Sequence, residues 1–157
     1  MEDPPSGTIA LLFTDIESST LLARATGDGW GDVLAAHHAL LRDAIEGHGG
    51  YIDLTEGDAF FATFADTRAA VDAAVEAQRA LAAASWPPEV GELRVRMGVH
   101  TGYVERRELG YVSIEVHRAA RVGAAAAGGQ VFVSEDAGES WSVAAEGLPR
   151  LSALVLA

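Results

Sequence analysis

The chain of 157 residues contains no cysteine, no lysine and no asparagine. Without cysteine it forms neither disulfides nor thiolate metal sites. Any mechanism that takes a lysine or an asparagine from this chain is excluded as well. No apolar run is long enough to span a bilayer, so we expect no membrane partner. The acidic, proline-rich start is unlike a signal peptide, and together these absences predict a cytoplasmic protein.

Basic side chains are also scarce. The chain carries 11 lysines and arginines against 23 acids, a net charge of −12. Such a surface repels nucleic acid and suits divalent cations, so we expect no nucleic-acid partner. A nucleic-acid-binding ferredoxin-like domain fits poorly for a second reason, because no predicted strand carries exposed aromatics beside basic residues. The length and the 49% apolar fraction predict one folded domain with a real core.

The hydrophobic pattern predicts alternating strands and helices between residues 8 and 140, after a flexible lead-in over 1–7. After Glu135 the signal fades into a short helix. Residues 141–157 are weakly predicted, and we interpret them as a C-terminal tail or as the start of a linker. The order contains a βαββαβ core, which predicts an α+β, ferredoxin-like fold with an antiparallel sheet and helices mainly on one face. The predicted strands cover residues 8–14, 51–55, 59–64, 93–100 and 130–134, with a loop or hairpin over 103–112. The predicted helices cover residues 17–25, 30–46, 66–84 and 115–127.

An apolar run that ends in Asp15 and continues into Ser18, Ser19 and Thr20 is the most informative stretch. The hydroxyl residues are good helix caps, so Asp15 is expected where a strand ends and a helix begins. The helix start offers free N–H groups, which suits a metal ion beside a phosphate. The alternative is that Asp15 only caps the helix.

A second acid, Asp58, is predicted at the tip of a hairpin that lies beside the first strand. Two carboxylates brought together in this way can hold one or two Mg²⁺ ions, although a turn aspartate alone is common. Arg118 and Arg121 are the best candidates for binding an anion, or else two solvated helix arginines. His37 and His38 are expected to be packed or solvated rather than ligands.

Four segments, in this order and spacing, resemble the class III adenylyl/guanylyl cyclase catalytic domain, above all its actinobacterial members. They are Phe13–Thr20, Glu56–Phe61, Leu93–Gly102 and Val116–Arg121. The resemblance covers residues 8–140. It implies conversion of ATP or GTP to a 3′,5′-cyclic nucleotide and pyrophosphate by a head-to-tail homodimer with shared sites.

The resemblance also assigns roles to single residues. Asp15 and Asp58, with the carbonyl of Ile16, would hold two Mg²⁺ or Mn²⁺ ions. Arg121, supplied by the partner chain, would stabilise the charged transition state. The loop from Glu17 to Thr20 would cradle the triphosphate. The remaining nucleotide-binding positions implied by the resemblance are Phe13, Thr14, Leu54, Gly57 and Gly110.

Three positions depart from the family pattern. Leu54 stands where family enzymes usually carry a base-recognising lysine, and Gly110 where they carry aspartate or threonine. His117 replaces the asparagine that orients the ribose or the transition state. We therefore expect weak base selectivity and low or absent turnover. The alternative is a catalytically inactive, cyclase-like module that binds a nucleotide or dimerises and regulates a downstream domain.

Overall fold

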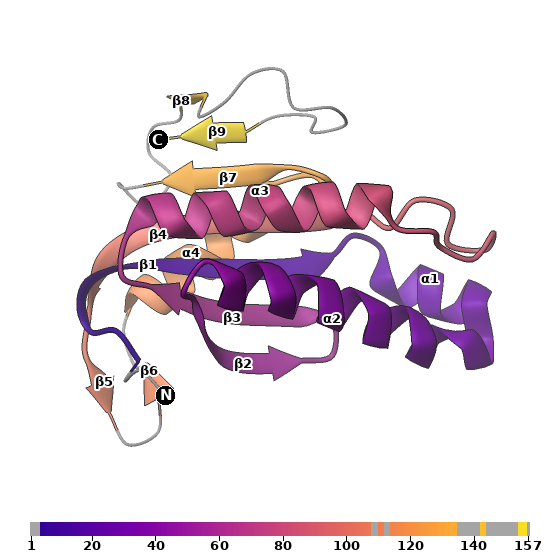
Figure 1. Cartoon of the computed structure of the whole chain (residues 1–157), viewed down its shortest axis with the longest axis horizontal. Helices are drawn as coiled ribbons and strands as arrows, with labels where there is room; N and C mark the ends of the chain where they lie inside the picture. Colours follow the sequence, from indigo (N-terminus) through magenta and orange to yellow (C-terminus); the bar gives the residue numbers. More distant parts are fainter. Residues whose placement is uncertain (1–3, 108–109, 112–113, 135–141, 144–153, 157) are drawn as a thin grey trace.

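The computed structural model describes residues 4–107, 110–111, 114–134, 142–143 and 154–156 (Figure 1). Its strands are β1 (Gly7–Ile16), β2 (Tyr51–Glu56), β3 (Ala59–Phe64), β4 (Val95–Val104), β5 (Arg106–Arg107), β6 (Gly110–Tyr111), β7 (Val131–Ser134), β8 (Ser142–Val143) and β9 (Leu154–Leu156). Its helices are α1 (Ser19–Thr26), the 3₁₀ turn η1 (Gly27–Gly29), α2 (Trp30–Gly47), α3 (Thr67–Ala83) and α4 (Ile114–Ala125).

One sheet with the strand order β2-β3-β1-β4-β7-β9-β8 organises the fold. The first four strands of this order are antiparallel and form the predicted βαββαβ core, so the α+β, ferredoxin-like prediction is confirmed. Beyond β4 the sheet differs from a purely antiparallel one. β7 joins β4 in parallel, because α4 carries the chain back across the sheet, and β9 joins β7 in parallel.

Helices cover both faces of the sheet, unequally. α2 and α3 pack side by side on one face, and α4 lies on the other (Figure 1). β1 is central and serves both faces: Ala10 and Leu12 belong to the larger core under α2 and α3, whereas Ile9 and Leu11 belong to the smaller one under α4. This double burial explains why the sequence of β1 is almost continuously apolar.

The helix α3 begins and ends as its sequence predicts. The Asp66 carboxylate accepts a 2.9 Å hydrogen bond from the amide of Ala69 and caps the helix. Past the other end, the indole of Trp86 donates to the carbonyl of Leu81 at 3.0 Å, and two prolines follow.

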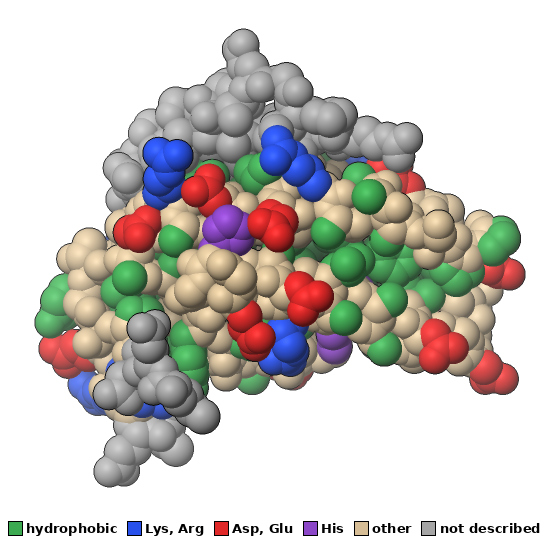
Figure 2. Space-filling model, in the orientation of Figure 1, with side chains coloured by type: hydrophobic (Ala, Val, Ile, Leu, Met, Phe, Trp, Pro, Cys, Tyr) green, Lys and Arg blue, Asp and Glu red, His purple; other side chains and the backbone are tan. Residues whose placement is uncertain are grey.

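Acidic side chains and a few arginines alternate on the face that α2 and α3 present, so its charge is spread rather than gathered into one patch (Figure 2).

Two local expectations need correction. The first helix begins at Ser19 rather than Glu17, and Ser18 precedes it in a left-handed conformation, with φ of 59° and no side-chain cap. In the tail, residues 154–156 form β9, which adds to the sheet beside β7. Most of the short helix expected after Glu135 lies outside the described residues. No helix in the described ranges combines the length and apolarity needed to cross a membrane.

Candidate active site

The end of β1 and the tip of the β2–β3 hairpin meet, as the sequence predicted. Asp15 is the second-last residue of β1, and Asp58 follows Gly57 in the hairpin turn. The amide of Ile16 donates a 2.6 Å hydrogen bond to Oδ2 of Asp58. This bond holds the hairpin tip against the residue that follows Asp15.

The carboxylate of Asp15 binds Arg96, a residue to which the sequence analysis assigned no role. The two residues are register partners on β1 and β4. Nε of Arg96 donates to Oδ1 of Asp15 at 2.8 Å, and the guanidinium also donates to Oδ2. The hydrogen bond to Asp15 raises the pKa of Arg96, which therefore stays charged. Asp15 is thus not a helix cap.

The donor set at this corner fits a hard divalent cation. Asp15 and Asp58 supply carboxylate oxygens, and the main chain at Ile16 can add a carbonyl, which are ligands that Mg²⁺ and Mn²⁺ prefer. Both acids are partly exposed, so an ion can reach them. Within the described ranges no three histidine, aspartate, glutamate or cysteine side chains gather into a closed cluster. A cation here would need to displace Arg96 from Asp15 and take further oxygens from a ligand.

The carboxylate in the loop after β1 already has partners in the structure. Glu17 accepts a 3.4 Å hydrogen bond from the amide of Gly128 and pairs with Arg94 at 3.5 Å. Ser18, Ser19 and Thr20 are exposed or half-buried at the start of α1. Their hydroxyls and amides are therefore the groups of this loop that an anion can reach.

Two histidines of α2 lie under the hairpin. Nε2 of His38 is 2.8 Å from the carbonyl oxygen of Gly57 and donates to it. His37 is fully buried against Phe60, and neither ring nitrogen has a hydrogen-bond partner among the described residues. Burial, aided by the nearby charge of His38, lowers the pKa of His37 from 6.5 to about 4. His37 is therefore a neutral core residue, and His38 braces the turn that carries Asp58.

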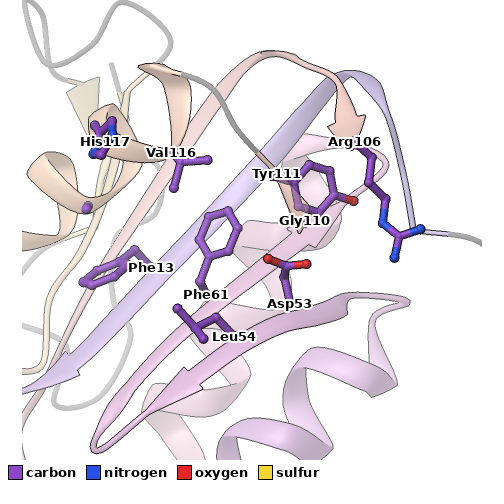
Figure 3. Close-up of a pocket in the computed structure, with 10 residues that line it drawn as sticks. Phe13, Asp53, Leu54, Phe61, Arg106, Gly110, Tyr111, Val116 and His117 are labelled. Carbon is purple, nitrogen blue, oxygen red and sulfur yellow. The ribbon is translucent and has the colours of Figure 1, made fainter. Parts of the chain in front are cut away.

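A cavity of about 520 Å³ opens on the α4 face of the sheet (Figure 3). This volume falls within the range of small-molecule sites. Four residues that the sequence analysis assigned to the site come together here: Phe13, Leu54, Gly110 and His117. Six further residues complete the lining: Asp53, Phe61, Arg106, Tyr111, Val116 and Ala120.

Other predicted residues lie away from the cavity. Arg121 is exposed one turn after His117 on α4, and within the described residues it makes no ion pair. Thr14 is fully buried, and its hydroxyl has no partner among the described residues. Arg118 donates a 2.6 Å hydrogen bond to Glu115, whose other oxygen binds buried His100. Arg118 is therefore engaged in a bridge between α4 and β4 rather than free for an anion.

Comparison with known proteins assigns the chain to a family. The sequence model of the family described as "Adenylate and Guanylate cyclase catalytic domain" matches residues 1–146. The chain belongs to this family. An adenylate cyclase of Mycosarcoma maydis is 37% identical over a match of 157 positions. The match covers 85% of this chain and 6% of that protein. An uncharacterized protein of Mycobacterium tuberculosis strain H37Rv is 35% identical over 138 residues, covering 87% of the chain and 46% of that protein.

The fold of this cyclase domain agrees with the assignment. A structure of adenylate cyclases from Trypanosoma brucei in their monomeric state superposes with a TM-score of 0.77 at 30% identity, covering 94% of this chain and 88% of that one. The chain spans only a small part of the fungal relative and less than half of the mycobacterial one.

Proposed function

We propose that this cyclase domain converts a nucleoside triphosphate, ATP or GTP, into a 3′,5′-cyclic nucleotide and pyrophosphate. One observation carries the proposal: the 2.6 Å hydrogen bond from the Ile16 amide to Asp58, which joins the hairpin tip to the strand end that carries Asp15. Two acids on a strand end and a neighbouring turn, beside an exposed helix start, suit a metal–triphosphate ligand.

Asp15, Asp58 and the carbonyl of Ile16 would hold two Mg²⁺ or Mn²⁺ ions. Such ions, when bound, neutralise phosphate charge and make a ribose hydroxyl a better nucleophile. Ser18, Ser19 and Thr20 offer hydroxyls and amides to the phosphates. Glu17 and Gly57 belong to the adjoining loop and turn, and Phe13 and Thr14 belong to the strand β1 that leads into that loop. Arg96 would turn from Asp15 to a phosphate oxygen, because its guanidinium already lies at the metal corner.

Arg121 would act on the site of a second copy of the chain in a head-to-tail homodimer. Its exposed guanidinium, without an ion pair in the described residues, is available to a phosphate of the nucleotide held by the partner. His117 lies one helical turn earlier on α4 and lines the cavity, so the cavity and Arg121 belong to the same half of the shared site. The imidazole of His117 would donate a hydrogen bond to the ribose.

Turnover is expected to be low. His117 differs in reach and charge from the asparagine that the family usually carries, and Leu54 and Gly110 offer no side-chain hydrogen bonds to a base. The chain covers only part of the length of its relatives. In our proposal the cyclase domain therefore works beside a downstream regulatory region.

The test is product formation by the purified, dimeric protein with ATP or GTP and Mn²⁺. We expect slow accumulation of cyclic nucleotide, reduced at least about 100-fold by Asp15→Asn, since removing one charged metal ligand removes most of the stabilisation of the reacting phosphate. Glu56→Gln, which removes an exposed charge from the same hairpin, is the matched control. If Asp15→Asn makes product as fast as the control, the proposal fails.

A further inference from the structure

Asp53 enters the cavity because of an irregularity in β2. Ile52 pairs with Ala62 on β3 and Leu54 pairs with Phe61, so Asp53 is an extra residue with no partner of its own. In a regular strand, neighbouring side chains point to opposite faces. A bulge breaks this alternation and re-aims a side chain. As a result both Asp53 and Leu54 line the cavity (Figure 3).

The carboxylate of Asp53 occupies the space above Gly110. A Cβ atom built on Gly110 would lie 3.3 Å from Oδ2 of Asp53. Gly110 also has a φ of +97°, a conformation that side chains rarely adopt. The missing side chain at position 110 thus makes room for a carboxylate that comes from β2 instead. In Figure 3 the Asp53 carboxylate points toward Gly110 and Tyr111, away from the strand that carries it.

In the part of the chain that the structure describes, no group donates a hydrogen bond to this carboxylate. Within the described residues Asp53 makes no hydrogen bond and no ion pair at contact distance. Burial raises the pKa of Asp53, and the charge of Arg106, which also lines the cavity, opposes that rise. Arg106 itself lies over the ring of Tyr51, 6.0 Å from its centroid. A partly buried carboxylate without a donor is costly unless a ligand supplies one.

The walls beside Asp53 are apolar and suit a planar ring. Phe13 and Phe61 extend from the sheet, Leu54 lies below them, and Val116 faces them from α4 (Figure 3). An aromatic heterocycle between these side chains would bury its faces and turn one edge to Asp53. The edge that satisfies both carboxylate oxygens presents two parallel N–H donors.

We propose that Asp53 determines the base specificity of the nucleotide site by binding the N1–H and the 2-amino group of guanine. This inference rests on the proposed function, and it makes GTP the preferred nucleotide. Adenine presents one amino group beside an acceptor nitrogen on the same edge, and that nitrogen would face a carboxylate oxygen. Asp53 therefore supplies the base recognition that the side chains at Leu54 and Gly110 do not provide.

The experiment measures binding of four triphosphates by calorimetry in the presence of Mn²⁺: GTP, ITP, ATP and XTP. ITP lacks the 2-amino group, and XTP carries a carbonyl in its place. We expect the wild-type protein to bind GTP more tightly than ITP or ATP by about 10-fold, because a partly buried carboxylate oxygen is then left without a donor. Asp53→Asn should weaken GTP binding by about 10- to 100-fold and shift the preference to XTP, whose carbonyl accepts from the new amide.

Glu56→Gln is the control, because it removes one exposed negative charge from the same strand without entering the cavity. If Asp53→Asn and Glu56→Gln change the ratio of GTP to ATP affinity equally, the assignment of Asp53 is wrong. If the wild-type protein binds all four triphosphates equally, it is also wrong, while the proposed function stands provided that Asp15→Asn weakens all four. If no triphosphate binds, both the inference and the proposed function fail.

Discussion

Asp15 and Arg96 stand opposite each other on β1 and β4, and one guanidinium donates hydrogen bonds to both oxygens of the carboxylate. The pair neutralises Asp15 at the corner where a metal–triphosphate ligand is proposed to bind. Since both side chains are about one-quarter to one-third exposed, the pair is accessible to a competing cation. Under the proposed function, Arg96 would therefore compete with a metal ion for Asp15 in the free protein, and it would become available to a phosphate when the metal is bound.

Arg96→Gln should separate these two effects. Without the competing guanidinium, Mn²⁺ alone should bind about threefold to tenfold more tightly, a modest gain because the ion pair is partly exposed. Triphosphate affinity at saturating Mn²⁺ should fall, because a phosphate-binding charge is lost. Calorimetric titration with Mn²⁺ and then with GTP measures both. Equal Mn²⁺ affinity in the variant and the wild-type protein would show that Arg96 does not compete for Asp15.

His38→Ala should loosen the turn that carries Asp58. The ring donates a 2.8 Å hydrogen bond to the carbonyl of Gly57, and loss of such an outer contact typically costs about 10-fold in metal affinity. Global stability should change by only about 1 kcal/mol, since one partly exposed hydrogen bond is lost. His38→Gln can restore a donor and is expected to recover most of the affinity for GTP with Mn²⁺.

The readouts for His38 are calorimetry and hydrogen exchange at the hairpin. Exchange at Asp58 and Ala59 should be faster in the alanine variant and close to wild type in the glutamine variant. Identical binding by all three proteins would contradict a positioning role for this residue.

Acid should destabilise the protein through His37. Because the pKa of His37 falls from 6.5 to about 4 on folding, the unfolded chain takes up a proton between these values and the folded protein does not. Stability is therefore full above pH 6.5, falls as the pH is lowered, and loses no more from this group below about pH 4. At about 1.4 kcal/mol per pKa unit, the loss reaches about 2 kcal/mol by pH 5.

Urea denaturation at pH 7.5 and pH 5 checks this expectation. His37→Leu removes the titrating group and leaves an apolar side chain in an apolar site, so it should reduce the stability difference between the two pH values by about 2 kcal/mol. An unchanged difference in this variant would mean that other groups cause the acid sensitivity.

Gly50→Ala should destabilise the junction between α2 and β2. A Cβ at Gly50 would lie 2.5 Å from the ring of Phe64 and 2.7 Å from Ile45, both fully buried. Such overpacking typically costs about 1–3 kcal/mol, measured as the free energy of unfolding in urea. Gly47→Ala is the control: nothing lies within 4 Å of its Cβ position, and alanine in the last turn of α2 should be neutral or slightly stabilising. Equal stability of the two variants would contradict the packing argument.

The sequence by itself determined the elements and the ends of most of them. Apolar spacing specified α2 and α3, Asp66 specified the start of α3, and an acidic glycine turn placed Asp58 at a hairpin tip. These features depend on neighbours within about one helical turn or one tight turn, where backbone geometry alone relates the residues. The order of the motifs was likewise sufficient to indicate the cyclase family.

Only the tertiary structure decided which side chains face one another. The register of β1 against β4 sets Arg96 opposite Asp15, and neither residue carries a local sign of the other. The bulge at Asp53 depends on how β2 pairs with β3, because a shift of one residue moves a side chain to the other face of a sheet. The sequence predicted a base pocket emptied at Leu54 and Gly110, but a carboxylate from the strand beside it reaches the space that Gly110 leaves open.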